Sequence, residues 1–407
     1  MRNGLAIAGG VVVIVLVVLL GQGWRSKSVL EARLRAAEAD RAQLAEESRA
    51  DKERVLSLTE GRNGDRALIA QLWGLVHAGG SRPDGKEAKQ PAATFDLTAL
   101  KEMAGASGGD LNQVVRRVLT PEGLKASLQR HADQPAYWVA AASLCGDPAQ
   151  ALEYLETAAA RFPGSAIAQA ALIEAKRDLR QADAATRAAI ENLRKADPTS
   201  SLADHYDAYF RFQEGDAAGA LQALAAASEK DRFADHRMEL MMSRFQCLLE
   251  NGCSDGGALA LSAFSLGFEH LPMLREVSQK ALEQAQAAHT AGEQEPALNT
   301  ADAVARIGRN LSASGRFIVY DRVGMGMQEA ALMAKRGFYE AAGNTYQVGE
   351  IDFQLGALQR RSAQIRDMAG AFGGVLANMT DEGIVRYIEA TIMHGEFTTL
   401  QDLTARP

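Results

Sequence analysis

The sequence predicts an all-α protein: an N-terminal transmembrane helix and a helical stalk, followed by a solenoid of short helices. Three observations predict this fold. Aromatic residues make up only 6% of the 407 residues, and alanine dominates stretches such as residues 168–196. Alanine favours helix, whereas aromatic and β-branched residues favour strand. A continuous apolar run stands near the N-terminus, and a helix-opening motif occurs twice, 69 residues apart.

The apolar run predicts a membrane anchor over residues 1–24. Residues 4–24 read GLAIAGGVVVIVLVVLLGQGW and contain one polar side chain. A helix of about 20 residues spans a hydrocarbon core of roughly 30 Å. The sequence GQG before Trp24 is a poor signal-peptidase site, and no cysteine follows it to accept a lipid. We therefore expect an uncleaved anchor rather than a removed signal peptide.

The charges beside this anchor bear on its orientation. One arginine precedes the apolar run, and four basic residues follow it closely. The positive-inside rule then places the large C-terminal part in the cytoplasm. Export of that part stays open, because many exported signal-anchored proteins also have a short tail with one arginine. The expected location is a membrane crossed once, such as a bacterial inner membrane. The charges are Arg2 on one side and Arg25, Lys27, Arg33 and Arg35 on the other.

Residues 25–78 are predicted to form a helical stalk, and residues 79–94 a flexible linker. The stalk begins with 36 residues free of Gly and Pro and rich in Ala, Leu, Glu and Arg. Its seven-residue apolar series is broken at Asp51, so a self-associating coiled coil and a single solvated helix both remain open. The linker is rich in Pro, Gly and charge, without an apolar period. The members of the series are Leu30, Ala37, Leu44 and Leu58.

After the linker, residues 95–130 are expected to form leading helices, and a repeated Gly-Asp motif follows them. In residues 146–165 (GDPAQALEYLETAAARFPGS), glycine permits a tight turn and Pro148 begins a helix. The same opening returns in residues 215–231 (GDAAGALQALAAASEKD). Residues at steps of four and three after each motif share one helix face. These are Ala151, Leu155 and Ala158, and then Ala220, Leu224 and Ala227.

This pattern resembles the tetratricopeptide repeat, whose units of about 34 residues each fold as two antiparallel helices. The two motifs are almost two such units apart, and Pro163 and Pro198 fit the ends of successive units. The resemblance implies a TPR-like helical-repeat array over residues 131–360, with later candidate units at Gly292 and Gly337. Residues 361–407 are predicted to be capping helices. Within them, Thr380 is the expected N-cap, and Ile384, Ile388 and Ile392 share one helix side.

The resemblance also implies how such an array would work. In this family the first helices of successive units line a concave groove that binds a peptide or protein segment. The side chains expected in that groove are His205, Tyr209 and Phe212, at the helical spacing i, i+4, i+7. An aromatic stripe at this spacing also fits a packed core, so both interpretations stay open.

Composition disfavours several other functions. The net charge of −7 argues against nucleic-acid binding, which usually needs a basic face. The seven histidines are dispersed and match no metal-binding motif, so we expect no metal and no cofactor. The three cysteines lack the spacing of a disulfide framework. Buried free thiols are the expected state, although Cys247 and Cys253 could pair if the domain is exported.

One stretch hints at an enzyme. Residues 316–330 (RFIVYDRVGMGMQEA) place Gly324 and Gly326 after a β-branched and aromatic run, but Glu329 stands where a dinucleotide fingerprint needs its third glycine. We expect a helix with two close-packing glycines and no enzyme or catalytic residues. The predicted function is a membrane-tethered adaptor or scaffold that binds a protein partner. Alternatives are a structural spacer that oligomerises through its stalk and a nucleotide-binding enzyme.

Overall fold

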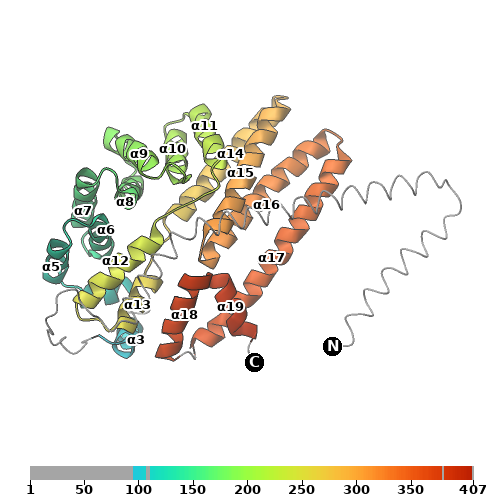
Figure 1. The fold of residues 1–407 in the computed structure, drawn as a ribbon. Coiled ribbons are helices and arrows are strands. Elements are labelled where there is room, and N and C mark those ends of the chain that lie inside the picture. The colour runs from blue at the N-terminus through green and yellow to red at the C-terminus, as the bar shows by residue number, and fades with distance from the viewer. Residues whose placement is uncertain (1–94, 107–110, 378–379, 406–407) are drawn as a thin grey trace, which may run out of the picture. The chain divides into compact units, whose positions relative to one another are not determined.

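The computed structural model describes residues 95–106, 111–377 and 380–405, which form helices α3 to α19 (Figure 1). Apart from two isolated bridges, these residues form no strand, so the predicted all-α class is confirmed. They all belong to one compact unit, Asp84–Pro407. Within the described ranges, no helix is both long and apolar enough to cross a bilayer. The predicted anchor, stalk and linker (1–24, 25–78 and 79–94) lie outside these ranges.

The leading helices are α3 (Leu97–Ala106), α4 (Leu111–Val118) and α5 (Pro121–Arg130). Helix α5 begins as its sequence indicates, because the Thr120 hydroxyl accepts a hydrogen bond from Gly123 N at 3.1 Å. Proline follows at the first helical position, where its missing N–H removes no intrahelical bond.

Three antiparallel helical hairpins follow and carry the repeated motif. Each hairpin packs on the next, and together they form an arc (Figure 1). In the middle hairpin Thr186, Ile190 and Leu193 are buried. Of the positions expected to pack after the Gly-Asp motifs, all three after the second are buried, whereas Ala151 after the first is only half-buried. The hairpins are α6 (Pro135–Leu144) with α7 (Pro148–Arg161), α8 (Ala166–Asp178) with α9 (Ala184–Ala196), and α10 (Leu202–Gln213) with α11 (Ala217–Ser228).

Both Gly-Asp motifs lie at turns, as predicted. Asp147 caps α7 by accepting from Ala149 N at 3.0 Å, and Asp216 caps α11 by accepting from Gly219 N at 2.9 Å. The two glycines differ in conformation, however. Gly215 has φ +82°, a left-handed geometry that favours glycine, whereas Gly146 is not among the residues with positive φ.

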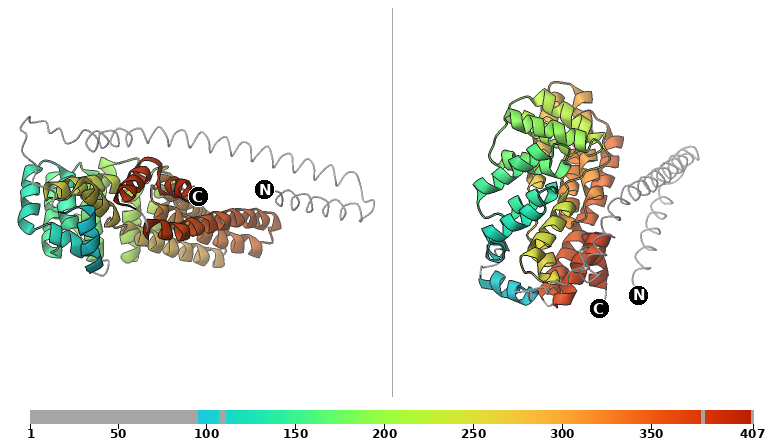
Figure 2. Two further views of the ribbon diagram at one scale, coloured as in Figure 1. Left: turned by 90° about the horizontal axis from the view of Figure 1, so that it is seen from below. Right: turned by 60° about the vertical axis from the view of Figure 1, so that its left-hand side comes forward.

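The chain then forms longer helices and two short terminal ones. The layer α14–α17 contains the longest, and the four helices lie side by side (Figures 1 and 2). The bounds are α12 (Arg237–Glu250), α13 (Asp255–Phe264), α14 (His270–Thr290), α15 (Gln294–Ser314), α16 (Ile318–Ala341), α17 (Thr345–Ala377), α18 (Asp381–His394) and α19 (Glu396–Ala405).

Two predictions about this second half are corrected. Gly292 lies at the turn between α14 and α15 with φ +83°, but Gly337 lies inside α16, and the next turn is made by Gly343 with φ +70°. A helix tolerates an interior glycine at a cost of about 1 kcal/mol, so the residue alone does not mark a turn. The boundary predicted at residue 360 falls inside the continuous helix α17.

The glycine pair predicted to pack closely does so at one of its two positions. A Cβ added at Gly324 of α16 would collide with the carbonyl oxygen of Gly308 in α15, so these backbones nearly touch. Gly326 has no heavy atom within 4 Å of such a Cβ. Further along the same helices, small side chains pack around Phe338: Ala285, Ala297 and Ala301 are all fully buried.

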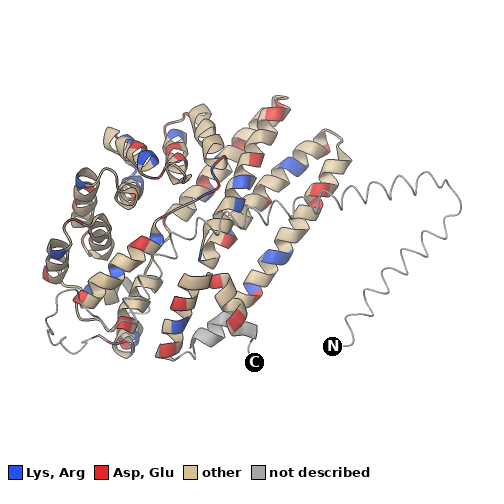
Figure 3. Ribbon diagram, in the orientation of Figure 1, with Lys and Arg blue, Asp and Glu red and all other residues tan. Residues whose placement is uncertain are grey.

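The C-terminal helices behave as caps, but over a limited area. The Thr380 hydroxyl accepts from Gly383 N at 3.2 Å, and the predicted isoleucine side of α18 is buried. Helix α18 packs on α13, and α19 packs on α17. Acidic and basic side chains are interspersed along the described helices (Figure 3).

Candidate functional site

The side of α6, α8 and α10 that the resemblance assigns to a groove is here called the inner face. Helices of the same chain occupy much of it: α12 packs against α6, and α14 packs against α10. The first helices of the hairpins therefore do not line an open groove along their whole length. Candidate docking positions are limited to the parts that α12 and α14 leave uncovered.

A buried charged cluster holds α12 and α14 against the inner face. Arg237, at the start of α12, donates from Nη2 to both carboxylate oxygens of Glu174 in α8, at 2.8 and 2.9 Å. The same nitrogen lies 3.1 Å from a carboxylate oxygen of Glu269, and the Tyr206 hydroxyl donates to Glu174 at 2.9 Å. Because Arg237 satisfies two carboxylates at once, its removal would leave buried charge unpaired.

Burial shifts the titration of this cluster. Burial raises the pKa of Glu174, and the positive charge of Arg237 opposes that shift. For His270 of α14, burial lowers the pKa well below its ordinary value, and Arg237 lowers it further. Both shifts favour the neutral form of the side chain. Two arginines act in this cluster: Arg237 contacts the Glu174 carboxylate directly, and buried Arg177 donates to the Glu269 carbonyl at 2.7 Å.

Of the three predicted partner-binding residues, only His205 belongs to this packed interior. His205 is 1% exposed, its ring centroid lies 5.9 Å from that of Phe233, and burial lowers its pKa to about 4. Tyr209 is partly buried. Burial raises its pKa, and the negative charge of Glu276 in α14 raises it further. Phe212 is partly exposed. The expectation that His205 contacts a partner is therefore corrected, because the protein's own side chains already cover it.

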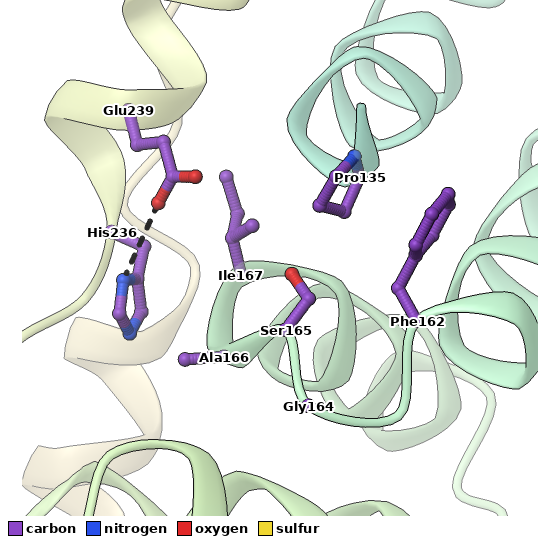
Figure 4. Close-up of a pocket in the computed structure, with 8 residues that line it drawn as sticks. All are labelled: Pro135, Phe162, Gly164, Ser165, Ala166, Ile167, His236 and Glu239. Carbon is purple, nitrogen blue, oxygen red and sulfur yellow. Dashed lines mark ion pairs between the residues drawn. The ribbon is translucent and has the colours of Figure 1, made fainter. Parts of the chain in front are cut away.

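An open hollow of about 490 Å³ remains at one edge of the inner face, where three helices begin (Figure 4). Helix α6 starts there at Pro135, α8 starts after Ser165, and α12 starts after His236. We call it the rim hollow. It is lined by Pro135, Phe162, Gly164, Ser165, Ala166, Ile167, His236 and Glu239.

The rim hollow combines apolar walls with one polar side. Phe162 offers apolar surface on one side, and His236 Nδ1 lies 3.7 Å from Glu239 Oε2 on the opposite side, with Ile167 next to this pair (Figure 4). His236 also lies 3.8 Å from Asp197 and adopts φ +57°, a strained conformation for a residue other than glycine. Strain of this kind is retained where the surrounding structure or a function requires it.

The helix starts give the rim hollow a favourable field for hydrogen-bond acceptors. The first amides of a helix lack intrahelical partners and carry partial positive charge. Glu239 stands in the first turn of α12, where it offsets that field, whereas α6 and α8 have no acidic residue in their first turns. The arrangement can therefore bind an apolar side chain together with a carbonyl or carboxylate.

No competing chemical site is found in the described part of the chain. It contains no cluster of three His, Cys, Asp or Glu residues that could hold a metal ion. All three cysteines are free, and burial raises the pKa of Cys247 and of Cys253 to about 12. Gly324 and Gly326 lie inside α16 rather than after a strand, so the context of a dinucleotide fingerprint is missing there.

Comparisons with known proteins give no further assignment: no protein-family model, no curated protein and no solved structure matches this chain.

Sequence reasoning missed the cluster that fills the inner face. Glu174 and His270 stand in helical segments where a charged or titratable residue usually faces solvent. The stretch before α12 offered little signal, because Asp235, His236 and Arg237 continue a charged run that begins at Glu229. A polar run at that position can mark buried charges, but only the fold shows that residues 63 positions apart meet there.

Proposed function

We propose that this protein is a membrane-tethered helical-repeat adaptor that binds a segment of another protein at the rim hollow. One observation carries the proposal: the rim hollow is an open part of the inner face, beside the region that α12 and α14 occupy. The paired helices α6–α11, with turns at both Gly-Asp motifs, support a TPR-like interpretation of this region.

The lining of the rim hollow indicates what it would bind. An apolar side chain of the partner would lie against Phe162 and Ile167, and its backbone carbonyls or a carboxylate would face the starts of α6 and α8. A volume of about 490 Å³ accommodates a few residues. The partner element is therefore a short extended segment rather than a folded surface.

The proposed tether comes from the sequence. An apolar run over residues 4–24, with a stalk and a linker after it, would hold the helical unit close to a bilayer. The partner would then be another membrane protein or a protein that assembles at the same surface. Tethering raises the effective concentration of such a partner, so modest affinity at the rim hollow suffices.

Site-specific photo-crosslinking tests this proposal. Gly164 borders the rim hollow, and a Cβ added there meets no heavy atom within 4 Å, so a photoreactive side chain fits without disturbing the fold. The matched control is Lys195, an exposed position on α9. We expect a discrete adduct in intact membranes from position 164 and none from position 195.

Binding by the captured segment completes the test. A synthetic peptide of the crosslinked segment should bind the full-length protein in detergent, measured by fluorescence anisotropy. Gly164→Trp, which fills the rim hollow, should weaken that binding at least tenfold, whereas Lys195→Trp should leave it unchanged. Equal adducts at both positions, or binding that Gly164→Trp does not affect, would contradict the proposal.

A further inference from the structure

The outer side of α17 is exposed and partly apolar. Tyr346 is 68% exposed and Phe353 is 62% exposed, and Met333 on the neighbouring helix α16 is 60% exposed. Side chains of this size usually lie in contact with other atoms, and three of them on adjacent helices form an interaction surface. The opposite side of α17 packs inward, since Ile351 is 2% exposed and Ile365 is 1% exposed.

Small residues run along this exposed side at constant spacing. Gly349, Gly356 and Ala363 are seven residues apart, and at about 100° per residue they lie within one narrow sector of the helix. No heavy atom lies within 4 Å of a Cβ added at Gly349, and only the Arg360 guanidinium does so at Gly356. Unlike Gly324, these two glycines are not required by any close contact among the described residues.

Glycine weakens a helix interior relative to alanine, so glycines at exposed Gly349 and half-buried Gly356 need another reason. A seven-residue repeat of small residues lets a second helix lie close along the same seam. The small residues form the centre of that seam, and Phe353 and Tyr346 flank it on one side.

Helix α17 is also the last long helix of its layer. It packs on α16 and on α19, and the guanidinium of Arg361 lies 3.6 Å from the ring centroid of Phe397 in α19. This contact covers one side of α17 beyond residue 360, whereas Ala363 and Asp367 stay exposed. The segment from Tyr346 to Arg360 is left open, as at the end of a helical array that a neighbouring subunit would extend.

We propose that a second copy of this chain covers that segment, with the two α17 helices antiparallel and a two-fold axis passing beside Gly356. In this register Gly349 of each copy faces Ala363 of the other. Phe353 precedes the axis by three residues and Arg360 follows it by four, both on the same side of the seam, so each phenyl ring meets the guanidinium of the other copy.

The next pair outward has the same complementarity. Tyr346 precedes the axis by ten residues and Asp367 follows it by eleven, so the phenol of one copy can donate a hydrogen bond to the carboxylate of the other. A two-fold contact makes every such pair twice, which suits a self-complementary surface. A parallel two-fold arrangement would instead place Phe353 of one copy and Arg360 of the other on opposite edges of the seam, so this pair would not form. The antiparallel second copy is therefore the occupant that the charges favour.

Cysteine crosslinking of the full-length protein in membranes tests this register. Near the two-fold axis, Gly356→Cys brings two Cβ atoms close enough for a disulfide. The control is Gln354→Cys, an exposed position about 160° around the helix from Gly356. In a Cys145→Ser background, mild oxidation should convert most of the Gly356→Cys protein into covalent dimer and little of the control. Equal crosslinking of both variants, or none of either, would overturn the proposal.

A second variant separates loss of the dimer from loss of the fold. In Gly349→Leu/Gly356→Leu, the new side chains block close approach, yet leucine is the better helix former at both positions. Sedimentation of this variant in detergent should report one chain where the natural sequence reports two, with no decrease in thermal midpoint. An oligomer that persists in this variant would place the association elsewhere, in the predicted stalk for example, and would contradict the role of α17.

Discussion

The hairpins α6–α11 and the layer α14–α17 both consist of antiparallel helices rich in small residues, yet different interactions hold them in place. Buried charges connect the hairpins to α12 and α14, as between Glu174 and Arg237. In the layer, backbones approach closely at Gly308 and Gly324, and alanines pack around Phe338. In this protein, small residues determine how closely two helices approach, whereas buried polar groups determine which helices pack together.

The sharpest way to break this comparison is to remove the central charge of the hairpin junction. Arg237→Ala leaves Glu174 buried without its main counter-charge, and breaking such a pair costs about 3–5 kcal/mol. We expect the free energy of unfolding to fall by this amount, measured by chemical denaturation of the full-length protein in detergent. Arg306→Ala is the control, because its partner Glu229 is exposed; such a surface pair contributes about 1 kcal/mol or less. Equal losses in the two variants would contradict a special role for Arg237.

In the layer, the corresponding change is Gly324→Val. Its side chain would force the carbonyl of Gly308 away, and overpacking of this kind costs about 1–3 kcal/mol. Gly326→Val is a matched control two residues along the same helix, where no heavy atom lies within 4 Å of the added Cβ. The control should change the thermal midpoint little. A control as destabilised as Gly324→Val would show that the close contact with Gly308 does not explain the loss.

Acid should distinguish the two regions as well. Burial lowers the pKa of His205 to about 4 in the folded protein, below the ordinary value of about 6.5 expected after unfolding. Neutral His205 therefore contributes fully to the free energy of unfolding above pH 6.5. This contribution is lost as the pH falls toward 4. Between pH 7 and pH 5 the free energy of unfolding should fall by about 2 kcal/mol through this group.

His205→Leu isolates this term, because the neighbouring carboxyl groups of Glu174 and Asp235, whose pKa values burial raises, titrate in both proteins. The difference in unfolding free energy between the natural protein and the variant should shift by about 2 kcal/mol over the same pH range. A pH-independent difference would mean that His205 is not buried in its neutral form.

The smallest expected effect compares the two Gly-Asp turns. Gly215→Ala places a Cβ in left-handed geometry at φ +82° and should cost about 1 kcal/mol. At Gly146, φ is not positive and the nearest atoms belong to the flexible Arg116 side chain, so alanine should change the thermal midpoint little. If the two variants lose equal stability, the two glycines do not differ in backbone conformation as described.

Local features of the fold could be predicted from the sequence. Thr380 caps the helix that follows it, and Gly215 and Gly292 lie at turns. Each of these depends on a few neighbouring residues, whose capping and backbone preferences act locally. The predictions over residues 1–94 lie outside the described residues and stay predictions.

Long-range features could not be predicted in the same way. Gly337 has the sequence surroundings of a turn but lies within α16, because helix propensity and packing outweigh one glycine. The stripe of His205, Tyr209 and Phe212 has a helical period that a binding face and a packed core share. Only the return of α14 to α10 decides between them, and periodicity carries no information about that contact.

The most direct test of this account is the titration of His205 in the full-length protein, followed by NMR with selectively labelled histidine. His205→Leu identifies the resonance. If the protein's own helices fill the inner face, His205 titrates near pH 4, as burial of its ring requires. A titration near the ordinary value of about 6.5 would show an open groove at α10 and would contradict the proposal that partners bind at the rim hollow instead.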